Sequence, residues 1–568
     1  MGVVLACGFW AARWRRPPTL ANLDEWGLGG RSFGPVLTWF LVSGDLYTAY
    51  TFVALPALVY AVGAVGFFAV PFATIVLPLG FVALTRMWSV AHVHGVVTPA
   101  DFVRIRFGSP LLALTVGVCG IVATMPYIAL QLLGMEAVFK TMGLAGAWPL
   151  WVAFGLLALF TYNAGLRAPA LFAIVKDILI LWVVLAALVI VASRAGGWSR
   201  VFQTAAAKFA ATPSTADGLL LTSGQAQINY VTLALGSALA IFLYPHAITG
   251  FLAARNRATV RRTLLGLPVY TFALGIVALF GYVAIAERIT PVGADGNTIM
   301  PRLFDLVFPD WVAGTAYAAL VIGAFVPAAI MSIAAANLFT RNIYKEFIRP
   351  RALPAEEARV SRIVSLMVKF GAVVTVVFLP TQFSLDLQLI GGVIILQTLP
   401  AVAIGLFTAW MHRHALTAGL VTGLACGLFM LYETPGRAAN GSPLLHFGGS
   451  AFPLSKIGIE GGYSIYTGLI ALAVNLAVAV AATVLLRLTR VPDGEDITWR
   501  RDYLADEEDR GIRRLDELLD GRSADPSFHA SPAKHAAPED PRPPRQITGD
   551  DTPTQTLPVT RPDDWRRG

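Results

Sequence analysis

The chain has 568 residues, of which 56% are hydrophobic and 14% charged, and its mean hydropathy is +0.64. These values exclude an ordinary soluble domain and indicate a polytopic membrane protein with room for roughly a dozen spans. The net charge of +8 does not indicate nucleic-acid binding, because the basic residues lie in short loops between apolar segments.

Residues 1–12 are apolar, end at a basic cluster and lack a secretory cleavage pattern. This stretch is too short for a full span, so we expect either a truncated first helix or an interfacial anchor. Residues 1–33 are therefore predicted to form a short N-terminal helix and a cytoplasmic linker.

Twelve apolar segments follow, and each is predicted to be a spanning helix. They cover residues 34–61, 64–88, 110–139, 147–165, 168–193, 229–254, 262–287, 311–345, 359–380, 384–409, 414–433 and 462–489. The predicted fold class is thus all-α. Loops rich in Lys and Arg alternate with poorer loops, which places the basic loops on the cytoplasmic side. Residues 194–228 are predicted to be a polar extracellular loop.

The tail, residues 491–568, is predicted to lie in the cytoplasm. It is rich in Pro, Asp, Glu and Arg and poor in large apolar residues. This composition predicts disorder, apart from one helix near residues 502–520.

Two predicted spans are interrupted by polar residues. The first contains Ser-Gly-Asp-Leu-Tyr-Thr-Ala-Tyr-Thr at 43–51, and the sixth contains Tyr-Pro-His at 244–246. Interrupted spans at matching positions of two five-helix halves are typical of inverted-repeat transporters, with the binding site between the breaks. The halves would cover residues 34–193 and 229–409, followed by two peripheral helices at 410–490.

The acidic residues within spans are the most informative candidates. A carboxylate at mid-membrane is costly unless it is paired, hydrated or protonated, so Asp45 is predicted to act in cation coupling. The alternative for Asp45 is a structural hydrogen bond to a neighbouring helix. Asp177 either belongs to a cation path or forms a local pair with Lys176, a lysine able to snorkel to the interface.

Hydroxyl, amide and imidazole groups near the breaks are predicted to bind the substrate. The glutamines could equally bond helices to each other, and the histidine of the sixth span could be a satisfied core residue. The predicted substrate-binding residues are Tyr47, Thr48, Thr51, Tyr127, Gln131, Tyr244, His246, Gln388 and Gln397. By contrast, His92 and His94 are expected at the surface of a cytoplasmic loop.

The sequence offers no phosphate-binding loop, nucleophile elbow or metal-ligand cluster. An enzyme is therefore not expected, and an energy source other than an ion gradient has no support.

Six runs carry a resemblance to a known family. They are Glu-Trp-Gly-Leu-Gly-Gly-Arg at 25–31, Trp-Phe-Leu-Val-Ser-Gly-Asp-Leu-Tyr-Thr-Ala-Tyr-Thr at 39–51, Trp-Ser-Val-Ala-His at 88–92, Thr-Pro-Ala-Asp-Phe at 98–102, Ala-Thr-Met-Pro-Tyr-Ile-Ala-Leu-Gln-Leu at 123–132 and Gln-Leu-Ile-Gly-Gly at 388–392. With these runs, residues 20–490 resemble the sodium:solute symporter family, and within it the bacterial monocarboxylate permeases.

The resemblance implies a five-plus-five inverted repeat that works by alternating access. It also implies a sodium ion between the first and eighth helices, held by the carbonyls of Ser43, Leu46 and Ala329 and the hydroxyl of Ser332. The family has a second hydroxyl residue after that serine, where this chain has Ile333. Loss of that oxygen weakens a sodium site or replaces the ion by a proton. Asp45 and Asp177 match acidic positions of the family's proline symporters.

The expected function is therefore a plasma-membrane symporter that imports a small monocarboxylate such as lactate, pyruvate or acetate, driven by a Na⁺ or H⁺ gradient. The alternatives are the same fold with an amino acid or sugar as substrate, or a transporter-like sensor. The lipid bilayer is the expected partner, with neither nucleic acid nor an obligate protein partner.

Overall fold

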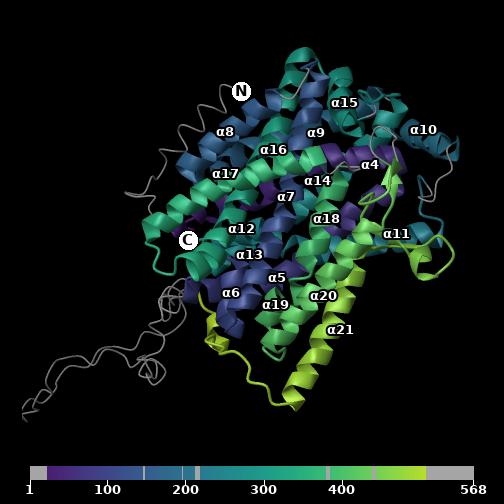
Figure 1. Cartoon of the computed structure of the whole chain (residues 1–568). Helices are drawn as coiled ribbons and strands as arrows, with labels where there is room; N and C mark the ends of the chain where they lie inside the picture. The colour runs from purple at the N-terminus through teal and green to yellow at the C-terminus, as the bar shows by residue number, and fades with distance from the viewer. Residues whose placement is uncertain are drawn as a thin grey trace, which may run out of the picture. The chain divides into compact units, whose positions relative to one another are not determined.

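The computed structural model describes residues 22–144, 148–194, 196–211, 218–293, 295–378, 384–437 and 443–506, and these are mostly helical (Figure 1). The stub at 1–12 and the tail beyond residue 506, with most of the helix predicted near 502–520, lie outside the described residues.

The first five predicted spans each contain a helix, as predicted. These helices are α3 (Pro35–Leu46) with α4 (Leu55–Val62), α5 (Ala69–His94), α7 (Pro110–Thr141), α8 (Trp148–Ala164) and α9 (Arg167–Arg194). Shorter helices precede or connect them. These are α2 (Leu23–Gly27), α6 (Pro99–Phe107) and the 3₁₀ turns Gly29–Arg31 and Ala64–Phe68.

The next five predicted spans are helical as well. They contain α11 (Gly224–Ile241) with α12 (Pro245–Leu252), α13 (Arg257–Gly266) with α14 (Pro268–Ala286), α16 (Asp310–Phe339), α17 (Pro354–Phe378), and α18 (Leu385–Leu396) with α19 (Leu399–Val402). Between them lie the 3₁₀ turn Gly296–Thr298, α15 (Ile299–Val307), the π-helical segment Thr340–Ile348 and the 3₁₀ turn Ile404–Leu406.

The last two predicted spans are α20 (Arg413–Tyr432) and α21 (Thr467–Leu488), which run side by side (Figure 1). Two small antiparallel hairpins connect them. They pair β1 (Gly436–Arg437) with β2 (Pro443–Leu444), and β3 (Ala451–Pro453) with β4 (Ser464–Tyr466), with the 3₁₀ turn Leu454–Ile457 between β3 and β4. The final element is the 3₁₀ turn Arg500–Tyr503.

By length and composition, seven of the described helices can cross a membrane, and three bent pairs bring the total to ten. The chain is thus a multi-pass membrane protein. Of the twelve predicted spans, α8 and α17 fall outside that count, since α8 has only 17 residues and α17 carries several charged residues. The central helix is α16, whose most apolar window is 89% buried and which contacts α3, α7, α9, α12 and α17.

Both predicted helix breaks are present. The α3–α4 span bends by 43° and the α11–α12 span by 46°. Pro245 begins α12, where its missing N–H costs nothing. The first break lies slightly later than predicted, because residues 43–46 remain in α3 and the chain leaves the helix at Tyr47, before a π-helical turn, Tyr50–Ala54. The repeat relationship between the two halves stays a prediction.

A third break was not predicted. The α18–α19 pair bends by 56° at Gln397 and Thr398. Pro400 lies in the first turn of α19 and is the sequence signal for this break.

The loop prediction for residues 194–228 is wrong in part. It contains α10 (Trp198–Ala211), which packs against α14. Its buried Val201 and Ala205 lie one turn apart, whereas Lys208 and the polar residues around them gave the segment a loop-like composition.

Disorder from residue 491 onward is also wrong for residues 491–506. Arg106 pairs with Asp496 at 2.5 Å, and the Ser89 hydroxyl donates to the Ala505 carbonyl at 2.7 Å. His94, predicted to be a surface residue, is instead buried, with its Nε2 2.8 Å from an Asp502 carboxylate oxygen. The acidic residues of this segment thus match the bases of the α5–α6 region, which composition alone does not reveal.

Loops predicted to be cytoplasmic meet at the same end of the helices. Arg31 donates to the Val96 carbonyl at 2.8 Å, and Arg86 to the Leu406 carbonyl at 3.0 Å. This grouping agrees with the alternation of basic loops, while the side of the membrane stays a prediction.

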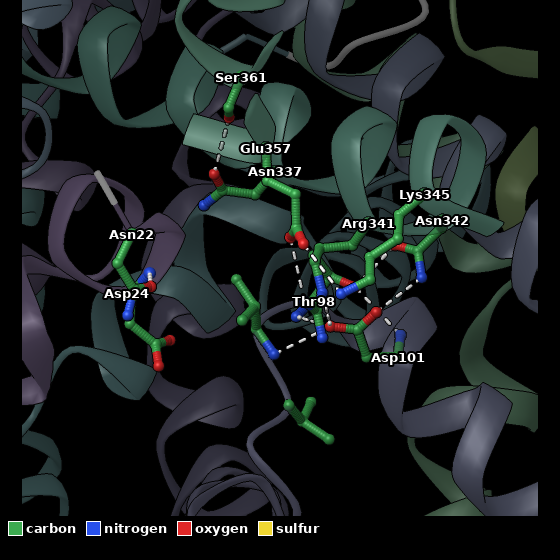
Figure 2. Close-up of polar contacts among 12 residues, drawn as sticks. Asn22, Asp24, Thr98, Asp101, Asn337, Arg341, Asn342, Lys345, Glu357 and Ser361 are labelled. Atoms are coloured by element: carbon green, nitrogen blue, oxygen red, sulfur yellow. Dashed lines mark hydrogen bonds and ion pairs between the residues drawn. The ribbon is translucent and has the colours of Figure 1, made fainter. Parts of the chain in front are cut away.

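The same end holds a buried polar network, shown in Figure 2. Asn342 lies 2.8 Å from both Thr98 and Asp101, which cap α6. Glu357 of α17 pairs with Arg341 at 3.2 Å and with Lys345 at 2.9 Å. These bonds tie α6 to the π-helical end of the central helix and to α17.

Candidate functional site

Two cavities flank the break in the first span. The first is lined by residues that include Asp45, Val76, Gly80, His246, Gly250 and Ile330. The second is lined by residues that include Tyr47, Tyr50, Thr51, Tyr127, Tyr270 and Gln388. Leu46 and Ile241 line both cavities. The structure therefore brings seven predicted residues, Asp45, Leu46, Tyr47, Thr51, Tyr127, His246 and Gln388, to cavities beside the two breaks.

Asp45 and His246 are neighbours in the lining of the first cavity. Asp45 lies in the last turn of α3, His246 lies in the first turn of α12, and His246 Nε2 is 3.4 Å from Asp45 Oδ2. Both residues are buried, yet the described residues give no hydrogen-bond partner to Asp45 Oδ1 or to either ring nitrogen of His246. Buried polar atoms without partners are rare, and here they line a cavity, which is the arrangement expected of a ligand site.

The second cavity repeats this feature. Within the described residues, the Tyr50 hydroxyl and Gln388 Oε1 are buried without a hydrogen-bond partner. Tyr244 donates to the backbone carbonyl of Gln388 at 3.0 Å, which connects the second break to α18. The ring of Tyr127, which lines the second cavity, lies 5.4 Å from the rings of both Tyr244 and His246.

A buried ion pair lies next to the first break. Lys176 and Asp177 are both fully buried in α9, and Lys176 Nζ is 3.2 Å from Asp177 Oδ1. The interpretation that Lys176 snorkels to the interface is therefore wrong, whereas the local pair with Asp177 is present. Asp177 Oδ2 also accepts hydrogen bonds from Ser43 and Tyr270, each at 3.0 Å.

Six of the nine predicted substrate residues bond to the protein itself. The hydroxyls of Tyr47, Thr51 and Tyr244 donate to the carbonyls of Tyr270, Leu46 and Gln388. Gln131 Oε1 accepts the backbone N–H of Ala49 at 3.0 Å and so caps the first break. The Thr48 hydroxyl accepts the backbone N–H of Tyr50 at 3.0 Å. Gln397 lies against α21, where Asn475 Nδ2 donates to its backbone carbonyl at 2.8 Å and to its Oε1 at 3.2 Å. This geometry favours the interhelical alternative for both glutamines.

The four oxygens expected to hold sodium all take part in hydrogen bonds within the protein. The Leu46 carbonyl accepts the Thr51 hydroxyl at 2.6 Å, and the Ser332 hydroxyl donates to the Ala329 carbonyl at 2.8 Å. The Ser43 carbonyl accepts a backbone N–H within its own helix turn. Each expected ligand is thus engaged in a bond within its own chain segment.

A positive charge already lies against this set. Lys176 Nζ donates to the carbonyls of Gly44 and Tyr47, at 2.5 Å and 2.7 Å, and these carbonyls alternate with those of the expected ligands. Two like charges about 4 Å apart repel by about 4 kcal/mol at an effective dielectric constant near 20. With Ile333 in place of a hydroxyl as well, the residues present do not fit a sodium ion.

Sequence reasoning missed Lys176, Tyr50 and Tyr270 as members of the site. The position of Lys176 could have predicted its burial. It is nine residues into α9, or about 14 Å along the helix axis, which is too deep for its side chain to reach the interface. Tyr50 lay within the polar run of the first span. Tyr270 lies in an otherwise apolar helix, and nothing in its local sequence marks it.

Comparison with known proteins gives a consistent picture. The family model described as the sodium:solute symporter family matches residues 26–425. A protein named monocarboxylate transport permease protein, from Rhizobium johnstonii, is 50% identical over 484 residues, which cover 85% of this chain and 95% of that protein. An uncharacterized symporter of Bacillus subtilis, YodF, is 33% identical over 440 residues, 76% of this chain and 86% of that protein.

More distant relatives include the sodium/proline symporter of Escherichia coli, 23% identical over 62% of this chain and 71% of that protein. Among solved structures, a Na⁺-coupled sialic acid symporter in a substrate-bound, outward-open state aligns with a TM-score of 0.66. The alignment covers 87% of this chain and 97% of that one at 16% identity, so it establishes a shared fold and no more.

Proposed function

Since this chain belongs to the sodium:solute symporter family, we propose that it is a secondary symporter that imports a small monocarboxylate across the plasma membrane, driven by a cation gradient. The 50% identical relative named as a monocarboxylate permease supports this substrate class.

The observation that carries the proposal is the unpartnered pair Asp45–His246 at the junction of the two helix breaks. His246 lies in the first turn of α12, whose N-terminal end carries partial positive charge. A substrate carboxylate placed there meets the helix N-terminus, the imidazole and, from the second cavity, the Tyr50 hydroxyl. These groups are suited to bind one carboxylate.

Asp45 explains why a cation accompanies the substrate. Its carboxylate lines the same cavity, and two carboxylates in a poorly hydrated site cannot both be charged without a positive partner. A proton or a metal ion bound with the substrate removes this repulsion. Substrate binding and cation binding are therefore favourable only together, which is the requirement for symport.

The lining of the first cavity supports a short, apolar carbon chain. Apart from Asp45 and His246, its lining residues are aliphatic or aromatic, or glycine. A sugar would need a ring of hydroxyl and amide partners, because each unpaired hydroxyl buried in such a site is costly. An amino acid is the stronger competitor, because Asp45 is able to pair with an ammonium group.

Uptake into proteoliposomes tests the proposal. We expect purified protein to accumulate labelled lactate or pyruvate when a sodium or proton gradient is imposed, and unlabelled acetate to compete. Absence of uptake under both gradients would refute transport. Uptake blocked by unlabelled proline or alanine, but not by acetate, would replace the monocarboxylate by an amino acid.

A further inference from the structure

The ammonium group of Lys176 lies at the end of α3, on the carbonyls of Gly44 and Tyr47, which directly follow in sequence the expected sodium ligands Ser43 and Leu46. Two of the three N–H donors of Lys176 have backbone carbonyl acceptors, and Asp177 Oδ1, 3.2 Å from Nζ, is its ion-pair partner. The side chain is completely buried, so no water competes for these bonds.

The break in the first span creates this position. Because α3 ends at Leu46, the carbonyl groups that follow Ser43, whose oxygen accepts the Tyr47 N–H, lie at the negative end of the helix dipole. Gly44 allows the lysine to approach, since a Cβ at this residue would lie 3.2 Å from Lys176 Nζ. A cation is thus held by the same polar backbone that a bound ion would use.

We propose that the Lys176 ammonium permanently takes the place of the coupling sodium ion, so that this transporter carries its substrate without sodium. The inference rests on the proposed transport function and specifies its coupling. It is supported by three independent features of the site: the bonds of Lys176, the hydrophobic Ile333, and the hydroxyl of Ser332 turned to its own helix.

Asp177 completes the argument. Its Oδ2 accepts hydrogen bonds from the hydroxyls of Ser43 and Tyr270, and its Oδ1 forms the ion pair with Lys176. Its negative charge is therefore already balanced inside the protein. A sodium ion would have to displace the ammonium, and the displaced lysine would remain buried beside it. Among the described residues, the end of α3 therefore carries its own tethered cation.

The first test compares salts with the wild-type protein. Uptake of labelled lactate and labelled pyruvate is measured in proteoliposomes under an imposed inward proton gradient, with sodium chloride on both sides or with potassium chloride in its place. We expect the initial rate to change by less than about twofold. A fall of about tenfold or more in potassium would overturn the proposal while leaving the transport function intact. No uptake under any gradient would instead refute the transport function.

The second test measures thermal unfolding of detergent-purified protein in the two salts. The wild-type protein should unfold at the same temperature in sodium and in potassium chloride, and stabilisation by sodium would overturn the proposal. Lys176→Ala empties the cation position, so sodium should raise its unfolding temperature by mass action. If Lys176→Ala folds and shows no such rise, the proposal is wrong. If it does not fold, the wild-type comparison decides.

Lys369 supplies the matched control. It is the other lysine among the described residues whose exposed fraction is below 2%, and its Nζ donates to the hydroxyls of Thr161 and Ser365 at 2.9 Å and 2.7 Å. Its partners are hydroxyls rather than a helix end and a carboxylate. Lys369→Ala should therefore lose stability without gaining a response to sodium. A sodium response in Lys369→Ala equal to that of Lys176→Ala would overturn the assignment to Lys176.

Discussion

Two groups of charged and polar side chains are buried in this protein, and they differ in how completely their atoms are bonded. The central group, at the two helix breaks, leaves Asp45 Oδ1 and both nitrogens of His246 without hydrogen bonds among the described residues. In the group at the basic-loop end, the carboxylates of Asp101 and Glu357 each have several donors, and Asn342 accepts from Thr98 and donates to Asp101 (Figure 2).

The difference separates a binding site from a structural joint. Charge burial occurs in both groups, so burial alone does not identify the functional one. The group at the basic-loop end connects three helical segments. Both of its carboxylates, Asp101 and Glu357, have cationic partners, as expected where rigidity is needed. The central group keeps unpaired atoms on a cavity wall, where a bound ligand can complete their hydrogen bonds.

The largest effect is expected at Asp45. Asp45→Asn removes the charge that makes the substrate carboxylate depend on a bound cation. We expect uptake driven by a gradient to fall about a hundredfold, equivalent to about 2.7 kcal/mol. The unfolding temperature should not fall, because Asp45 Oδ1 has no hydrogen bond to lose among the described residues. Near wild-type, gradient-dependent uptake by this variant would remove Asp45 from the mechanism.

Glu357→Gln should have the reverse pattern. The change removes the carboxylate shared by Arg341 and Lys345, and breaking a buried ion pair typically costs about 3 kcal/mol. We expect a lower unfolding temperature, while the KM for uptake stays within about threefold, or less than about 0.7 kcal/mol.

Glu356→Gln is the matched control. Glu356, next to Glu357 in sequence, pairs with the exposed Arg349 and accepts the Tyr344 hydroxyl, which a glutamine oxygen can still accept, so the variant should lose less than about 1 kcal/mol. Equal destabilisation by the two substitutions would show that the network in Figure 2 does not act as a joint.

Two buried glutamines of the tenth predicted span give a finer comparison. Gln388 has an unpartnered Oε1 on the second cavity, whereas Gln397 bonds to Asn475. Gln388→Leu should raise the KM for uptake about tenfold, a loss of about 1.4 kcal/mol, without loss of stability. Gln397→Leu should leave KM unchanged and destabilise the protein by about 1–2 kcal/mol, since Asn475 loses an acceptor. Uptake kinetics and thermal unfolding of both variants check this, and exchanged phenotypes would contradict it.

Most of the helices could be predicted from the sequence, because spans of about 20 apolar residues are a strong local signal. The break at Pro245 carried its own backbone signal, and Asp45 stood out because a carboxylate in an apolar span is costly. These features are local, and local features are what composition and periodicity report.

The remaining features depend on contacts between distant segments. Whether Gln131 binds substrate or caps the first break depends on Ala49, 82 residues away. The order of residues 491–506 depends on bases in the α5–α6 region, 390 residues or more earlier in the chain. Lys176 was misjudged because the carbonyls that hold it exist only where α3 ends.

The smallest effect is expected at the ordered part of the tail, where His94 and Asp502 form a third buried pair. Asp502→Asn removes the charge but keeps the shape, so the local free energy of opening should fall by about 1 kcal/mol. Trypsin should then cut at Arg500 or Arg501 about fivefold faster, because cleavage follows the population of the opened state.

Uptake should not change, since this segment contacts neither cavity. Asp506→Asn keeps a side-chain oxygen that can accept the backbone N–H of Arg257, so this control should be cut at about the wild-type rate. Equal cleavage of wild-type and Asp502→Asn protein would show that the pair does not hold the tail, whereas a large loss of uptake would extend the functional site to this end of the helices.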